Sequence, residues 1–121
     1  MLPPLEHGRP LREEEKRLIL AIAGTTSALK LRQIGDLDDI RVLDMNDGGM
    51  GSVRVIGSDD VASRRAVPVA SGLFADEDGV PISVQLNNDQ FGRLYEIDIW
   101  KADFSSVKKY PSPSVEMPKL R

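Results

Sequence analysis

The fold is decided by two stretches, Val80-Pro81-Ile82-Ser83-Val84-Gln85-Leu86 and Leu94-Tyr95-Glu96-Ile97-Asp98-Ile99-Trp100. Apolar and polar residues alternate along each of them, which is the pattern of β-strands that bury one face. The residues between them, Asn87 to Gly92, are rich in turn formers. The sequence therefore predicts an antiparallel hairpin in the C-terminal half of the chain.

The same alternation assigns the side chains of this hairpin to two faces. One face is apolar and is expected to form the core, with Ile82, Val84, Leu86, Tyr95, Ile97 and Ile99. The other face takes Leu94 and the candidate partner-binding residues, which are Ser83, Gln85, Glu96, Asp98 and Trp100. Trp100 is interpreted as an aromatic anchor for a partner. The alternative is that a loop, or Asp103-Phe104 folding back, covers it.

A helix is expected ahead of this hairpin, starting at Pro10 and ending at Gly24. The run Glu13-Glu14-Glu15 places negative charge at the positive end of its dipole. Its buried stripe is expected to contain Leu11, Leu18, Ile19 and Ile22. A second short helical piece is predicted over residues 25–34.

Two more strands are predicted over residues 40–45 and 52–56, joined by a turn at Asn46-Asp47-Gly48-Gly49-Met50-Gly51. A loop is expected over 57–65 and a further strand over 66–75, where Pro68 favours an edge position. The fold class is therefore α+β, with an N-terminal helix or helices packed on one face of a four- to five-stranded antiparallel meander. The domain is expected to span residues 10–110, between a flexible arm (1–9) and a proline-rich tail (111–121).

Composition excludes several classes of function. A chain of 121 residues is the usual size of one domain. Its net charge of −3 disfavours nucleic acid, because binding to phosphates needs an excess of basic residues. The absence of cysteine removes thiol nucleophiles and thiolate metal sites. No apolar run approaches the roughly 20 residues of a membrane span, so no membrane partner and a cytoplasmic location are expected.

Other candidate sites are weaker than the hairpin face. His7, the single histidine, has no second histidine or cysteine to join it in a metal or catalytic site. The glycine-rich loop 47–52 is followed by a strand, so a hairpin turn is favoured over a phosphate cradle. Oxygen ligands for a cation could come from the turns 76–78 and 87–89, although their spacing does not match a calcium loop. No catalytic residue, cofactor or metal is predicted.

The chain resembles a family of small bacterial proteins of unknown function over about residues 9 to 112. The resemblance is carried by Arg9-Pro10-Leu11, Asp47-Gly48-Gly49-Met50-Gly51-Ser52, Asp76-Glu77-Asp78-Gly79-Val80-Pro81 and Tyr95-Glu96-Ile97-Asp98-Ile99-Trp100-Lys101 with Asp103-Phe104-Ser105. These are mostly turn and strand residues, so they identify a fold rather than an activity. Proteins of this size and character resemble immunity or accessory proteins encoded beside bacterial toxins, which is the functional lead that the resemblance implies.

The leading hypothesis is a non-enzymatic protein-binding module, immunity-like, whose partner is a toxin or another protein. Acidic residues would speed its association with a basic partner. One alternative is a small ligand- or metal-binding enzyme that uses Glu96, Asp98 or the carboxylates of 76–78. In a strand, Glu96 and Asp98 would lie about 7 Å apart, which suits acid–base chemistry. The other alternative is a homo-oligomer whose exposed sheet face pairs with its own copy.

Overall fold

The structure is a computed structural model that describes residues 8–24, 37–56 and 64–112. His7, the helical piece predicted over 25–34 and most of the predicted loop, arm and tail lie outside these residues. No helix in the described ranges is long and apolar enough to cross a membrane.

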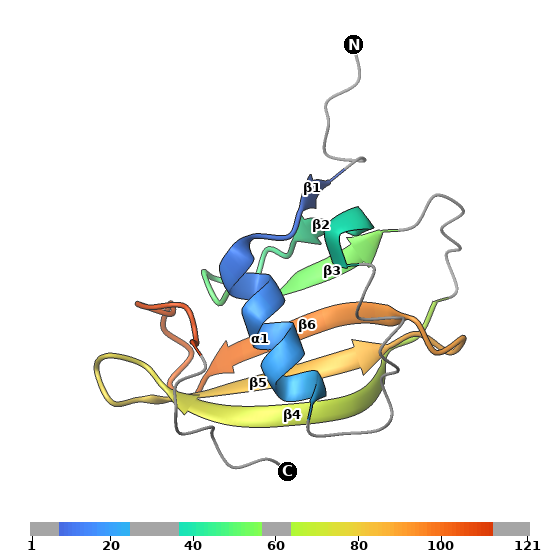
Figure 1. Ribbon diagram of the computed structural model, residues 1–121. Helices are drawn as coiled ribbons and strands as arrows, with labels where there is room; N and C mark the ends of the chain where they lie inside the picture. Colours follow the sequence, from blue (N-terminus) through green and yellow to red (C-terminus); the bar gives the residue numbers. More distant parts are fainter. Residues whose placement is uncertain (1–7, 25–36, 57–63, 113–121) are drawn as a thin grey trace.

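The fold is α+β, as the sequence predicts, but its antiparallel sheet has six strands instead of four to five (Figure 1). The added strand is β1, a two-residue segment that pairs with β2. The strands are β1 (Arg9–Pro10), β2 (Arg41–Asp44), β3 (Val53–Ile56), β4 (Val67–Ala75), β5 (Pro81–Asn88) and β6 (Leu94–Lys101).

The strand order is β1-β2-β3-β6-β5-β4, so the expectation of a simple meander is wrong. β3 pairs with β6, and β4 lies at the far edge of the sheet. Pro68 explains why β4 occupies an edge, because a proline has no N–H to donate to a second neighbour. The register of β4 against β5 shifts between Pro68 and Ala70, which marks a bulge beside the proline.

The hairpin of β5 and β6 is confirmed, with Val84 opposite Ile99 and Leu86 opposite Ile97. The predicted faces are wrong at the first two residues of β6, which are Leu94 and Tyr95. Asn87 pairs with Glu96 but Asn88 pairs with Leu94, so Tyr95 is an extra, bulged residue. Leu94 therefore turns into the core while Tyr95 is only half-buried. Strict alternation fails here because a bulge inserts one residue without a partner.

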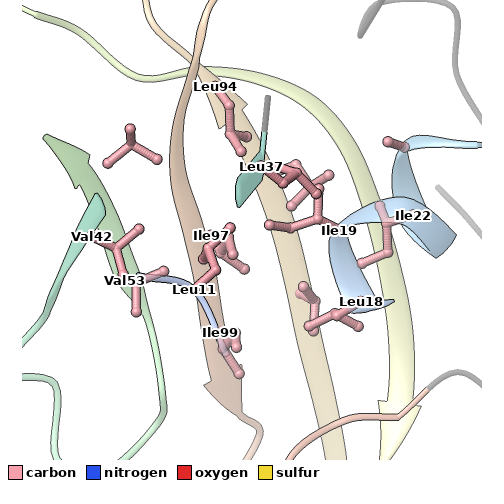
Figure 2. Close-up of a cluster of buried hydrophobic side chains, with 14 of the residues drawn as sticks. Leu11, Leu18, Ile19, Ile22, Leu37, Val42, Val53, Leu94, Ile97 and Ile99 are labelled. Carbon is pink, nitrogen blue, oxygen red and sulfur yellow. The ribbon is translucent and has the colours of Figure 1, made fainter. Parts of the chain in front are cut away.

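Helix α1 (Glu13–Ala23) lies across one face of the sheet (Figure 1). It begins three residues later than Pro10 suggests, because Arg9 and Pro10 belong to β1, and Gly24 ends it as predicted. The predicted inner residues of this helix, with Leu11 just before its start, are buried in one cluster with strand residues and with Leu37 of the 3-10 helix η2 (Leu37–Asp39) (Figure 2). The residues labelled there are Leu11, Leu18, Ile19, Ile22, Leu37, Val42, Val53, Leu94, Ile97 and Ile99. The core thus lies between α1 and the sheet.

The first-turn residue Glu15 is fully buried, unlike Glu13. Its carboxylate accepts two hydrogen bonds from the Arg9 guanidinium, at 2.9 and 2.8 Å, and one from the N–H of Arg12 at 2.7 Å. Arg9 also reaches Asp44 of β2 at 2.8 Å. An ion-pair chain therefore joins the start of α1 to the sheet.

The segment after β6 closes one end of the core. Val107 and Tyr110 pack against the hydrophobic cluster. The N–H groups of Lys108 and Lys109 donate to the Asp76 carboxylate at 2.7 and 3.0 Å. The turn between β4 and β5 thereby fixes this segment in place.

Candidate functional site

The sheet face opposite α1 brings the five predicted partner-binding residues together. Ser83 lies directly opposite Trp100, and Gln85 lies opposite Asp98. Side chains at directly opposed positions of an antiparallel pair point to the same face, and the alternate positions of both strands are in the core. We call this surface, formed by Leu73, Ser83, Gln85, Glu96, Asp98 and Trp100, the uncovered face.

Leu73 of β4 extends this surface, and the sequence analysis did not identify it. It pairs with Ser83, so Leu73, Ser83 and Trp100 form one row across three strands. Leu73 and Trp100 are each 38% exposed, which is a high fraction for large apolar side chains in a sheet. The signal that could have found Leu73 is the alternation of β4, which the bulge next to Pro68 obscures.

Phe104 does not cover Trp100 as the alternative interpretation proposed. Its side chain is 77% exposed, and packing on Trp100 would bury both rings. Its φ of 63° is the one positive value among the described residues other than glycine. Left-handed backbone is unfavourable for an aromatic residue, so the turn after β6 holds Phe104 in solvent at a conformational cost.

A chain of hydrogen bonds crosses the uncovered face. The Gln85 amide donates to Asn87 at 3.0 Å, and the Asn87 amide donates to Glu96 at 3.1 Å. The Arg54 guanidinium of β3 donates to the same carboxylate at 3.4 Å. Glu96 is thus neutralised by an ion pair and is only 14% exposed, so it is poorly placed as a general acid or base.

Asp98 is a residue of this surface whose ionised form is disfavoured by its surroundings. Partial burial, together with the nearby Glu96 carboxylate, raises the pKa of Asp98 above its usual value. Within the described residues no cation forms an ion pair with it. An ionised carboxylate held in this way would gain from a positively charged group brought by a partner.

Replacing Asp98 by Asn is expected to stabilise the protein at neutral pH. A folded-state pKa above the unfolded one means that the ionised form is disfavoured by folding, so stability is lost as pH rises through the folded pKa. Asp98→Asn removes that loss and should raise the melting temperature by about 1 to 3 °C at pH 7. The gain should vanish below the unfolded pKa of about 3.9. Thermal unfolding across pH, with Glu77→Gln as an exposed control, measures both.

Two carboxylates of the β4–β5 turn, those of Asp76 and Asp78, already share a cation of the protein. The Lys101 ammonium, which is fully buried, lies 2.9 Å from Asp76 and 2.6 Å from Asp78. It occupies the place between these carboxylates that a bound cation would need. No group of three or more His, Cys, Asp or Glu suited to a metal ion occurs in the part of the chain that the structure describes.

The turn between β5 and β6 is likewise held by its own residues. Asp89 accepts hydrogen bonds from the N–H groups of Phe91 and Arg93, at 2.9 and 3.0 Å. Arg64 and Arg93 lie 3.3 and 3.4 Å from its other carboxylate oxygen. Asp89 therefore shapes the turn, and its charge is balanced within the chain.

The glycine-rich loop is the hairpin turn between β2 and β3, as predicted. Asp47 accepts from the N–H groups of Met50 and Ser52, at 3.1 and 3.0 Å. Gly48, Gly49 and Gly51 have positive φ, which this turn requires. Because the Asp47 carboxylate already binds two N–H groups of the loop, a second anion would meet a negative charge there.

A shallow cavity of about 230 Å³ lies beside the bulge in β4. Its walls come from one strand segment and one neighbouring side chain, which are Pro68, Val69, Ala70, Ser71 and Gln85. Ligand sites of enzymes usually enclose about 300 to 1,000 Å³. This cavity is better suited to a single side chain of a partner than to a substrate.

Comparison with known protein families gives a match over most of the chain. The model of a family described as a domain of unknown function (DUF6984) matches residues 8–111. No curated protein and no solved structure matches the chain significantly. The match includes the whole described sheet and the uncovered face.

Proposed function

The chain belongs to the DUF6984 family, and from this premise we propose that it is a non-enzymatic protein-binding module that binds its partner through the uncovered face. The observation that carries the proposal is the row Leu73, Ser83 and Trp100, in which two large apolar side chains remain exposed on a face that α1 leaves free. Exposed apolar groups with a polar surround are typical of protein interfaces.

The polar groups around this row indicate the chemistry of the partner. Asp98 lies beside Trp100 on the same strand and carries a charge that its surroundings disfavour. A partner that presents an apolar side chain to Trp100 and a lysine or arginine to Asp98 would satisfy both. Such a complex should weaken as pH falls through the raised pKa of Asp98, because protonation removes the charge that the partner's cation contacts.

An enzyme that uses the surface carboxylates is the less well supported alternative. Glu96 is paired with Arg54, and Asp76 and Asp78 are paired with Lys101. Among the carboxylates of the described residues, Asp98 alone has a raised pKa, and its neighbour Glu96 is held in an ion pair. The ion pairs of Glu96, Asp76 and Asp78 within the fold favour binding over acid–base chemistry.

In the immunity-like version of the proposal, the partner is a toxin with a basic surface. It rests on the resemblance to small bacterial accessory proteins and on the net charge of −3, which favours encounter with a cationic protein. Products of genes adjacent to this one are therefore the first proteins to test as ligands.

Trp100→Ala is expected to weaken binding to that partner at least tenfold, because a buried tryptophan anchor contributes about 2 kcal/mol or more to an interface. Purified products of the neighbouring genes would be titrated by calorimetry against the wild type and the variant. Arg17→Ala, on the exposed side of α1, is the matched control and should bind as the wild type does. Failure of every neighbour to bind, or equal binding by Trp100→Ala, would contradict the proposal.

A further inference from the structure

Strand β4 leaves a long sheet edge without a partner strand among the described residues. It pairs with β5 on one side and is last in the strand order (Figure 1). Its nine residues, Val67–Ala75, include no charged side chain. Natural proteins usually protect such edges with lysine, proline or a bulge, because unpaired N–H and C=O groups attract another strand.

The protection of β4 covers only its first half. Pro68 and the bulge next to it interrupt the edge at one end, whereas residues 70–75 pair regularly with β5 and contain neither device. Leu73 and Ala75 are exposed in this second half. Among the described residues a regular and uncharged edge therefore remains, with exposed side chains at Leu73 and Ala75.

The direction of the backbone groups in this half follows from the turn that ends it. The N–H of Asp76 donates to the carbonyl of Val80 at 2.9 Å, so the backbone N–H and C=O of Asp76 point toward β5. Backbone groups alternate in direction along an antiparallel strand. The backbone groups of Phe74 and of the alternate residues before it therefore also point toward β5. The residues whose N–H and C=O groups point away from the sheet are Ser71, Leu73 and Ala75.

We propose that this edge pairs with β4 of a second copy of the chain, antiparallel, around a two-fold axis at Leu73. In this register Leu73 lies opposite Leu73 of the other copy, and Ser71 lies opposite Ala75. The outward N–H and C=O groups of all three residues then meet their equivalents in hydrogen-bonded pairs. The two sheets join into one, and Pro68 and the bulge lie outside the paired segment.

Side chains on both faces fit this register. On the core face, Phe74 lies opposite Gly72 of the other copy, so no side chain opposes its aromatic ring. Phe74 is only half-buried within one copy, so the pairing would cover it further. On the uncovered face, the two Leu73 side chains contact each other across the axis, as apolar cross-strand pairs do.

A second copy is a better occupant than a charged peptide of another protein. The edge carries no charge to select such a peptide, whereas its own sequence places the large Phe74 opposite Gly72 and the apolar Leu73 opposite its equivalent. A two-fold pairing also closes on itself, so one edge per copy yields a dimer and no open fibre. This interface uses the backbone of β4 and is separate from Trp100.

The test is the association state of the full chain by sedimentation velocity over a range of concentrations. The wild type should form dimers. Leu73→Lys should weaken the dimer at least tenfold, because two like charges would face each other at the axis. Ser71→Pro, which removes an outward N–H, should weaken it likewise. Leu20→Lys on α1 and Trp100→Ala should leave it unchanged, with circular dichroism confirming that each variant folds.

Three outcomes would overturn the inference. A wild-type chain that stays monomeric at high concentration does not pair through the β4 edge. A dimer that persists in folded Leu73→Lys and Ser71→Pro associates elsewhere. A dimer that Trp100→Ala abolishes joins through the uncovered faces instead of the β4 edges.

Discussion

Replacing Lys101 by methionine is expected to lower the melting temperature by roughly 10 °C or more. Lys101 is fully buried at the end of β6, and its ammonium lies between Asp76 and Asp78. Removing one member of a buried ion pair leaves the other charge without compensation. The Asp76 carboxylate also holds the segment after β6, so the loss should spread to that end of the core. Differential scanning calorimetry measures the effect.

Two matched variants separate the lost charge from the lost side chain. Lys109→Met changes the same residue type where the side chain is exposed and should leave the melting temperature nearly unchanged. Asp76→Asn combined with Lys101→Met removes both buried charges and should recover part of the stability. A Lys101→Met variant as stable as Lys109→Met would show that the buried ion pair contributes nothing.

The same cluster gives the wild type a defined pH dependence. Burial raises the pKa of Asp76, but hydrogen bonds from Lys108 and Lys101 outweigh it and hold that pKa well below its usual range. The resulting stability is present above the unfolded pKa of about 3.9 and is lost as pH falls below it. Burial lowers the pKa of Lys101, but Asp78 and Asp76 raise it overall. Its contribution is therefore lost in strong alkali. In Lys101→Met, both the loss of stability at low pH and the loss in strong alkali should be smaller than in the wild type.

Replacing Glu15 by glutamine is expected to reduce the free energy of unfolding by about 3 kcal/mol. The carboxylate is fully buried and accepts hydrogen bonds from the Arg9 side chain and the Arg12 N–H. Glutamine keeps the shape but removes the charge that balances Arg9 and offers only one acceptor. Urea unfolding measures the difference.

Glu13→Gln is the control for this prediction. Glu13 lies in the same first turn, but its side chain is 74% exposed, so the substitution should change the free energy of unfolding by less than about 0.5 kcal/mol. Equal effects of the two substitutions would mean that both residues act only through the helix dipole.

These two glutamates show where inference from the sequence stops. The run Glu13-Glu14-Glu15 correctly predicts the start of a helix, because charge near the N-terminus is a local property. Which of the three is buried depends on Arg9 and Asp44, and their meeting follows from the pairing of β1 with β2. A contact across 35 residues leaves no local pattern in the sequence.

The β5–β6 hairpin could be predicted because alternation and turn residues act over short distances. The five candidate residues share a surface for the same reason. Two details of the hairpin could not be predicted. The bulge at Tyr95 shifts one residue out of phase, and the buried Lys101 continues the core face of Ile97 and Ile99 with a charge that only the turn at Asp76 neutralises.

The strand order depends on tertiary pairing and was therefore beyond the sequence patterns. Pro68 did indicate an edge position for β4, because the sequence itself shows that a proline has no N–H to donate to a neighbouring strand. The pairing of β3 with β6, which separates β4 from its predecessor in the chain, has no such signal. Leu73 joined the uncovered face only once the register of β4 was known.

Fluorine NMR of the chain labelled with 5-fluorotryptophan tests the proposed binding surface most directly. The protein has a single tryptophan, so one resonance reports on Trp100, and an unlabelled partner stays invisible. We predict that the neighbouring gene product that binds in calorimetry will shift or broaden this resonance in proportion to the complex formed. A partner that binds fully while the Trp100 resonance stays unchanged would contradict binding through the uncovered face.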